Sequence, residues 1–210
     1  MSEDDAIGPL HVEVAGDGPV GLVLLPPNPL DSSSWLYQTA HLSSWFRTLA
    51  VDLPGYGHSP RLRGPVTMAG LADAVWAAVS AHGVERAVVA GVSIGASLSL
   101  HMLRRRPERS VAAIISGYGY SPEKPFAARR IEGYQQGGLR YRHEHLRDGF
   151  SEGFLSTPMG RYAESVAEDR AHLVDVPSIV HLFGAHGSPD DEALFRTPCP
   201  TLLIMGTEDY

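Results

Sequence analysis

Arg86-Ala87-Val88-Val89-Ala90-Gly91-Val92-Ser93-Ile94-Gly95 carries the clearest structural signal in this chain. Its first five residues predict a buried strand, and the apolar spacing after them predicts a helix from about Ile94 to Arg106. A serine nucleophile needs a sharp turn between a strand and a helix, with small residues two positions before and two after it. Gly91 and Gly95 meet that need. An ordinary turn can have the same Gly-x-Ser-x-Gly pattern, but the place of this one between a strand and a helix indicates a nucleophile elbow at Ser93.

The surrounding sequence alternates short apolar runs with longer amphipathic ones from Leu10 to Ser116, which is typical of a mostly parallel sheet covered by helices. Strands are expected at residues 10–14, 20–25, 46–53, 86–90, 111–116 and 200–205, and helices at 34–44, after Thr67 and at 94–106. Residues 117–197 are richer in charge, Gly and Tyr, and 162–173 is one of several weak helical stretches. We therefore expect three segments: a core at 1–116, an inserted helical cap at 117–197, and a core strand with a turn at 198–210.

Composition excludes several classes of protein. The chain has 210 residues and a net charge of −7, which suits one domain, or a domain with a small insertion, and argues against a nucleic-acid partner. No apolar run reaches the ~20 residues of a membrane span, and the start is acidic, so a cytoplasmic protein without a membrane partner is expected. Cys199 is the only cysteine, and no Cys/His spacing suggests a metal site. No phosphate-binding glycine pattern follows a strand, so no cofactor is expected. The oligomeric state stays open.

Several motifs in order make the chain resemble the α/β-hydrolase fold family over nearly its whole length. They are Leu22-Val23-Leu24-Leu25 with Asn28-Pro29 and Trp35, Asp52-Leu53-Pro54-Gly55-Tyr56-Gly57-His58-Ser59, the elbow at 91–95, Pro107-Glu108-Arg109, and Pro200 to Asp209. The resemblance implies a three-layer fold with helices on both faces of the sheet. It also implies that Ser93 is the nucleophile, that the N–H groups of Asn28 and Ile94 form the oxyanion hole, and that Asp209 orients a catalytic histidine. Asp52 is expected to shape a turn.

The chain also departs from the family pattern. Pro26-Pro27 stands where the family usually has His-Gly. Because proline has no backbone N–H, Asn28 alone must supply the hydrogen-bond donor of that loop. The family's catalytic histidine follows one further strand beyond the acid, whereas this chain ends one residue after Asp209. We therefore expect a C-terminally truncated chain whose residues 200–205 form an exposed apolar sheet edge. His58 and the cap histidines are the internal candidates for a base, although surface or packing roles are more common for each of them.

Two functions follow from these residues. The first is a serine hydrolase of esterase-like type that cleaves a small ester, amide or related carbonyl substrate through an acyl-enzyme on Ser93, with a general base from outside the 210 residues. Carbon–carbon bond hydrolysis and cofactor-free perhydrolysis use the same serine and stay open. The alternative is a non-catalytic or truncated binding protein with this fold that lacks the general base.

Overall fold

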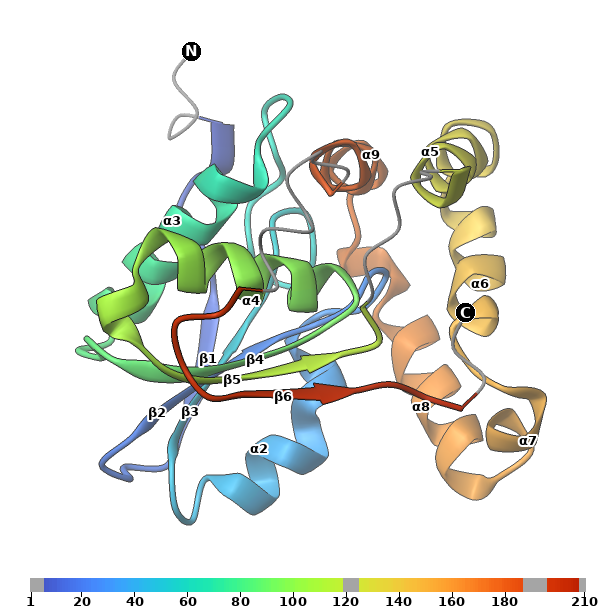
Figure 1. Ribbon diagram of the computed structural model, residues 1–210. Helices are drawn as coiled ribbons and strands as arrows, with labels where there is room; N and C mark the ends of the chain where they lie inside the picture. Colours follow the sequence, from blue (N-terminus) through green and yellow to red (C-terminus); the bar gives the residue numbers. More distant parts are fainter. Residues whose placement is uncertain (1–5, 119–124, 187–195, 208–210) are drawn as a thin grey trace.

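A computed structural model of the protein describes residues 6–118, 125–186 and 196–207 (Figure 1). Within these residues, six strands form one sheet in the order β1-β3-β2-β4-β5-β6, and every neighbouring pair is parallel except β1 with β3. The strands are β1 (Val12–Ala15), β2 (Gly21–Leu25), β3 (Arg47–Val51), β4 (Ala87–Val92), β5 (Ser110–Ser116) and β6 (Thr201–Ile204). The predicted mostly parallel sheet is confirmed.

Helices cover both faces of the sheet. Helices α3 (Met68–Ala81) and α4 (Ile94–Arg105) pack against each other on one face, and α2 (Leu36–Leu42) lies on the other (Figure 1). A short 3₁₀ turn, η1 (Ser32–Trp35), precedes α2, and another, η2 (Pro107–Arg109), follows α4. The predicted three layers are therefore confirmed. The single helix expected at 34–44 is wrong in detail, because Asp31 caps a 3₁₀ turn before the α-helix starts.

The central strand β2 explains why its sequence is apolar without alternation. Val23 and Leu25 point into the larger core beneath α3 and α4, whereas Leu22 and Leu24 point into the smaller core beneath α2. Every residue of β2 is buried. A strand covered on both faces needs apolar side chains at every position, which is what the sequence shows.

Helix α3 begins where its cap was predicted. The Thr67 hydroxyl accepts a 3.0 Å hydrogen bond from the Gly70 N–H, and the predicted apolar stripe of the helix is buried. Trp76 is also buried on this face, and its indole N–H donates to the Met102 carbonyl of α4 at 3.2 Å. This bond ties α3 to the helix that begins at the elbow.

The helices between β5 and β6 stand beyond the carboxyl ends of the parallel strands, and we call them the cap helices (Figure 1). They are α5 (Pro125–Gly137), α6 (Leu139–Asp148), α7 (Glu152–Leu155), α8 (Pro158–Asp169), η3 (Ala171–Leu173) and α9 (Val176–Ala185). The helical character expected here is confirmed for the described residues, although the stretch expected at 162–173 starts earlier and is interrupted at Arg170. None of the helices that the structure describes is long and apolar enough to cross a membrane.

The cap helices are joined to the core by hydrogen bonds as well as by packing. The Ser178 hydroxyl of α9 accepts a hydrogen bond from the Leu62 N–H at 2.8 Å, and the Asp175 N–H donates to the Gly55 carbonyl at 2.8 Å. Gly55 has φ +79°, and a Cβ there would lie 2.2 Å from that of Ser178. This close approach requires glycine and holds α9 against the loop after β3.

Among the described strands, β6 lies at one edge of the sheet and pairs with β5 alone. Its apolar side chains are largely exposed: Leu202 by 55%, Leu203 by 57% and Ile204 by 46%. The predicted exposed apolar edge is therefore confirmed.

Candidate active site

Ser93 occupies a strained turn between β4 and α4. Its backbone has φ 55° and ψ −117°, and it is the one non-glycine residue with positive φ among those the structure describes. Such a conformation costs about 1–3 kcal/mol and persists only where the surroundings enforce it. Here the Ser93 N–H donates to the Ser116 carbonyl at the end of β5, and its carbonyl accepts from the Ser97 N–H in α4, both at 3.0 Å.

Two glycines allow this turn to pack closely. A Cβ on Gly91 would lie 2.1 Å from the carbonyl oxygen of Gly95, and a Cβ on Gly95 would lie 2.3 Å from that of Leu25. The same Cβ on Gly95 would lie 2.7 Å from the Pro26 carbonyl oxygen. The first turn of α4 therefore lies directly against the loop that follows β2, and no larger residue fits at either position.

The Ser93 hydroxyl is available for chemistry. The side chain is half-buried, it does not cap α4, and no described residue forms a hydrogen bond with it. The first backbone N–H groups of a helix have no intrahelical acceptor, and they carry its positive partial charge. Ile94 begins α4, so its N–H is one of these donors beside Ser93.

Asn28 lies buried in the loop after β2. This loop is close to the elbow because Leu25 pairs with Gly91 in the parallel sheet. The hydroxyl of Tyr56 donates a 2.8 Å hydrogen bond to Asn28 Oδ1. Burial raises the pKa of Tyr56 well above its usual value, so the hydroxyl keeps its proton and remains a donor. The Tyr56 contact was not predicted, although Tyr56 stands within a motif that the sequence singled out.

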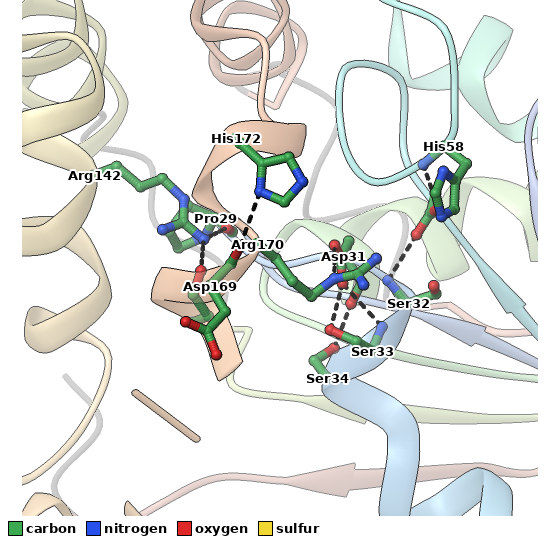
Figure 2. A network of polar contacts seen from close by, with 12 residues as sticks. Pro29, Asp31, Ser32, Ser33, Ser34, His58, Arg142, Asp169, Arg170 and His172 are labelled. Carbon is green, nitrogen blue, oxygen red and sulfur yellow. Dashed lines mark hydrogen bonds and ion pairs between the residues drawn. The ribbon is translucent and has the colours of Figure 1, made fainter. Parts of the chain in front are cut away.

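Two arginines from the segment of the cap helices also hold this loop (Figure 2). Arg142 of α6 is fully buried, and its Nη2 donates to the carbonyl oxygens of Pro29 at 3.2 Å and Ala167 at 2.9 Å. Arg170 forms an ion pair with the buried carboxylate of Asp31, with 2.5 Å between Nε and Oδ2. No sequence pattern marked either arginine, because each contacts a residue more than a hundred positions away.

Asp52 has the structural role expected for it. Its Oδ1 accepts from the Ser32 N–H at 2.8 Å, and its Oδ2 accepts from the His58 N–H at 2.9 Å. Gly57 has φ +54°, and a Cβ there would lie 2.1 Å from Asp52 Oδ2. Both carboxylate oxygens therefore fix backbone turns.

None of the histidines that the structure describes forms a hydrogen bond with Ser93. His58 is exposed, and its ring packs edge-on against His11 with 5.1 Å between the centroids. The described cap histidines other than His145 have these contacts: His143 with Glu168 at 2.9 Å, His172 with the Asp169 carbonyl at 2.9 Å, and His186 with the Tyr118 ring at 5.5 Å. His181 is half-buried on α9.

His145 is the most perturbed of these histidines. It is buried on α6, and its Nδ1 lies 2.8 Å from the hydroxyl of Tyr134. Burial, with smaller contributions from the positive charges of Arg130 and Arg142, lowers the pKa of His145 to about 3. An imidazole of such low basicity is a weak proton acceptor, so His145 is poorly suited to activate a serine.

Two further expectations concern the C-terminal segment and metal binding. Asp209 lies outside the described residues. Within the described part of the chain, no group of three or more His, Cys, Asp or Glu side chains is arranged to hold a metal ion. Cys199 is partly buried, and burial raises the pKa of its thiol, which disfavours the reactive thiolate.

Comparison with known proteins gives the family. A sequence profile of the Alpha/beta hydrolase family matches residues 22–210, which is most of the chain and includes the elbow. The chain belongs to the alpha/beta hydrolase family. In this family the Gly-x-Ser-x-Gly turn carries the nucleophile above the sheet, in the strained geometry that Ser93 adopts here.

Two curated relatives that match this alpha/beta hydrolase in sequence are named as enzymes. The pimeloyl-[acyl-carrier protein] methyl ester esterase of Vibrio campbellii is 32% identical over 119 residues, which cover 56% of this chain and 44% of that one. Epoxide hydrolase 3 of Siraitia grosvenorii is 32% identical over 130 residues, which cover 60% of this chain and 40% of that one. The match therefore spans less than half the length of either relative.

Solved structures agree on the fold. A thermophilic esterase from Thermogutta terrifontis has a TM-score of 0.78 at 24% identity, with 94% of this chain and 74% of that one covered. A bromoperoxidase from Bacillus anthracis has a TM-score of 0.82 at 18% identity, with 94% and 76% covered. At these identities the likeness establishes the alpha/beta hydrolase architecture and does not distinguish between reactions.

Proposed function

We propose that the protein is a serine hydrolase that cleaves a small ester, amide or related carbonyl substrate through an acyl-enzyme on Ser93. The observation that carries this proposal is the backbone of Ser93, held at φ 55° with its hydroxyl free at the start of α4. A strained turn that leaves a serine hydroxyl without a structural partner has no evident purpose in stability. Two relatives named as an esterase and an epoxide hydrolase support hydrolysis in general.

The proposed reaction proceeds in two steps. Ser93 Oγ attacks the carbonyl carbon, its proton passes to a general base, and the carbonyl oxygen becomes an oxyanion. The N–H groups of Ile94 and Asn28 hold this oxyanion. The leaving group departs with the proton, and the acyl group stays on Ser93. Water then attacks the acyl-enzyme by the same route, which releases the acid and restores the serine.

The support for this oxyanion hole is the close contact of the two segments that would form it. Gly95, one residue after Ile94, touches the Leu25 and Pro26 carbonyls at the start of the loop that carries Asn28. Tyr56 and Arg142 fix that loop by hydrogen bonds to Asn28 Oδ1 and the Pro29 carbonyl. Preorganised donors of this kind supply much of the rate enhancement in acyl transfer.

Asp209 and the general base complete the proposal. We assign Asp209 the orientation of a catalytic histidine, as the family resemblance implies. The base itself is assigned to none of the described histidines, because none of them forms a hydrogen bond with Ser93. That observation favours the second candidate function, a binding protein with this fold and no activated serine.

Labelling of the serine separates the two functions. A fluorophosphonate probe should modify Ser93, and Ser93→Ala should abolish labelling and lower the hydrolysis of short 4-nitrophenyl esters by about a thousandfold or more. The matched control is Ser97→Ala, one turn along α4, whose buried hydroxyl has no hydrogen-bond partner among the described residues. A wild-type protein that is neither labelled nor faster than Ser93→Ala would favour the binding protein instead.

A further inference from the structure

Buried hydrogen-bond donors without a partner gather where the cap region meets the loop after β2. Within the described part of the chain these are Nδ2 of Asn28, Nε and Nη1 of Arg142, and Nη2 of Arg170. Asn28 is 8% exposed and Arg142 only 2%. Nη2 of Arg142 donates to Pro29 and Nε of Arg170 donates to Asp31 of this same loop, so all four donors belong to one junction.

The side-chain oxygens of Asn28 and Asp31 and the carbonyl of Pro29 already accept hydrogen bonds. Asn28 Oδ1 accepts from Tyr56, and the Pro29 carbonyl accepts from Arg142 itself. The carboxylate of Asp31 accepts from the N–H and hydroxyl of Ser33 and from Arg170. What remains at this junction is therefore a surplus of donors.

The charged groups at this junction also leave one buried cation without a close counter-charge. The buried carboxylate of Asp31 pairs with Arg170, and no contact between it and Arg142 is seen among the described residues. Among the described residues, the carboxylate nearest to Arg142 is that of Glu168, whose Oε1 is 4.0 Å from Nη1 and 2.9 Å from Nδ1 of His143. Glu168 is also 39% exposed, so solvent weakens its attraction for Arg142. A buried cation that lacks a close counter-charge is costly to the folded protein.

We propose that this junction binds a carboxylate of the substrate, and that Arg142 is its principal ligand. The inference rests on the proposed hydrolase function and makes its substrate class narrower: an ester or related carbonyl compound that also carries a free carboxylate. Nε and Nη1 lie on different edges of the guanidinium, and each can donate a charge-assisted hydrogen bond to a ligand oxygen. The site is next to the loop of the proposed oxyanion hole, since Arg142 binds the carbonyl of Pro29, the residue after Asn28.

A carboxylate suits this junction better than a phosphate. Burial penalises a group steeply as its charge rises, and Arg142 carries a single positive charge whose closest described carboxylate oxygen, on Glu168, is 4.0 Å away. The donor atoms are covered in this structure, so entry of a ligand requires α6 and the loop to separate. The cap region would then close over the substrate and contribute the charge that recognises it.

The test compares acid esters with neutral esters of matched length. One series has the carboxylate on the acyl side, with monomethyl succinate, glutarate and adipate against methyl butanoate, pentanoate and hexanoate. The other has it on the alcohol side, with acetoxybutanoate against butyl acetate. In at least one series, wild-type kcat/KM should favour the acid ester by about ten- to a hundredfold, the range expected for a buried charge-assisted pair.

Substitution of the arginine should remove this preference. Arg142→Gln should bring the acid-to-neutral ratio of kcat/KM close to one, and Arg142→Lys, which keeps the charge on a single nitrogen, should give an intermediate ratio. Both substrates react at the same serine, so general damage to the loop cancels in the ratio. The matched control is Arg147→Gln on the same helix, an exposed arginine paired with Glu164 at 2.7 Å, which should leave the ratio unchanged.

The outcomes separate this inference from the proposed function. Hydrolysis of neutral esters without a wild-type preference for acid esters, or a preference that Arg142→Gln retains, overturns the inference alone. If no ester is hydrolysed, the proposed function fails, and the site is tested by binding. Glutarate should then raise the Tm of the wild type by more than that of Arg142→Gln or Arg142→Lys, and equal shifts overturn the inference. If Arg142→Gln does not fold, the acid-to-neutral ratio of kcat/KM of the wild type still tests the inference.

Discussion

The hydroxyl of Tyr56 donates a hydrogen bond to the side-chain oxygen of Asn28, and both groups are buried. The two residues lie 28 positions apart, in the loops that follow the neighbouring strands β3 and β2. The bond therefore joins two separate loops at the carboxyl edge of the sheet. It holds the residue that the proposed mechanism uses to stabilise negative charge.

Replacement of Tyr56 by Phe tests this bond. Tyr56→Phe leaves Asn28 Oδ1 buried without its donor, which should lower the free energy of unfolding by about 1–3 kcal/mol. Urea denaturation measures the loss, and ester hydrolysis should fall with it because Asn28 is less firmly placed. The control is Tyr37→Phe on α2, an exposed tyrosine, which should change stability by no more than about 0.5 kcal/mol. Equal effects of the two substitutions would contradict the role given to the bond.

The contact between α4 and the loop after β2 gives a second prediction. Gly95→Ala places a Cβ 2.3 Å from the Leu25 carbonyl oxygen, and neither backbone can move away easily. We expect a loss of about 3 kcal/mol or more in the free energy of unfolding, with slower fluorophosphonate labelling of Ser93.

The control for that substitution is another helical glycine. Gly184 lies near the end of α9, and a Cβ there meets no atom within 4 Å. Gly184→Ala should therefore leave stability unchanged or raise it by up to about 1 kcal/mol, because alanine favours the helix. Thermal melting of both variants measures the difference. A mild effect of Gly95→Ala would show that the close contact can relax.

The layers of the fold could be predicted because their signals are local. The apolar run of β2, the hydroxyl cap at Thr67 and the turn at Ser93 each lie within a few neighbouring residues. The ends of the strands were predicted less accurately, because pairing between strands determines where each strand ends. β4 extends beyond Ala90 to Val92 since Val92 pairs with Ser116 of β5.

The polar contacts around the site could not be predicted in the same way. Arg142 and Pro29 are 113 positions apart, and Arg170 and Asp31 are 139 apart. An arginine in an amphipathic helix is normally exposed to solvent, and the sequence does not indicate that the core covers this one. The burial of Arg142 depends on where α6 rests on the loop after β2, which only the tertiary structure reveals.

The buried His145 should make stability depend on pH. Its pKa of about 3 in the folded protein lies below the usual value of 6.5, so below pH 6.5 the unfolded chain binds a proton that the folded protein does not. Stability should therefore fall as the pH decreases from about 6.5 towards about 3, and this group should account for about 2 kcal/mol between pH 7 and pH 5.

Denaturant unfolding at these two pH values tests the effect. His145→Gln removes the titrating group, so its loss of stability between pH 7 and pH 5 should be smaller than that of the wild type. His41→Gln is the control, because it replaces an exposed histidine on α2 and leaves His145 in place. It should retain the wild-type contribution of His145. A wild-type loss that His145→Gln reproduces in full would show that other groups cause it.

The exposed strand β6 predicts self-association of the 210-residue protein. An edge strand offers unpaired backbone groups, and the half-exposed Leu202 and Leu203 add an apolar surface to them. Leu203→Lys should reduce light scattering at high protein concentration, because a charge on an edge strand opposes pairing with a second sheet. The free energy of unfolding should change by no more than about 0.5 kcal/mol, since Leu203 is 57% exposed. Leu203→Val keeps the apolar edge and should associate like the wild type. If Leu203→Lys associates equally, the contact between molecules lies on another surface.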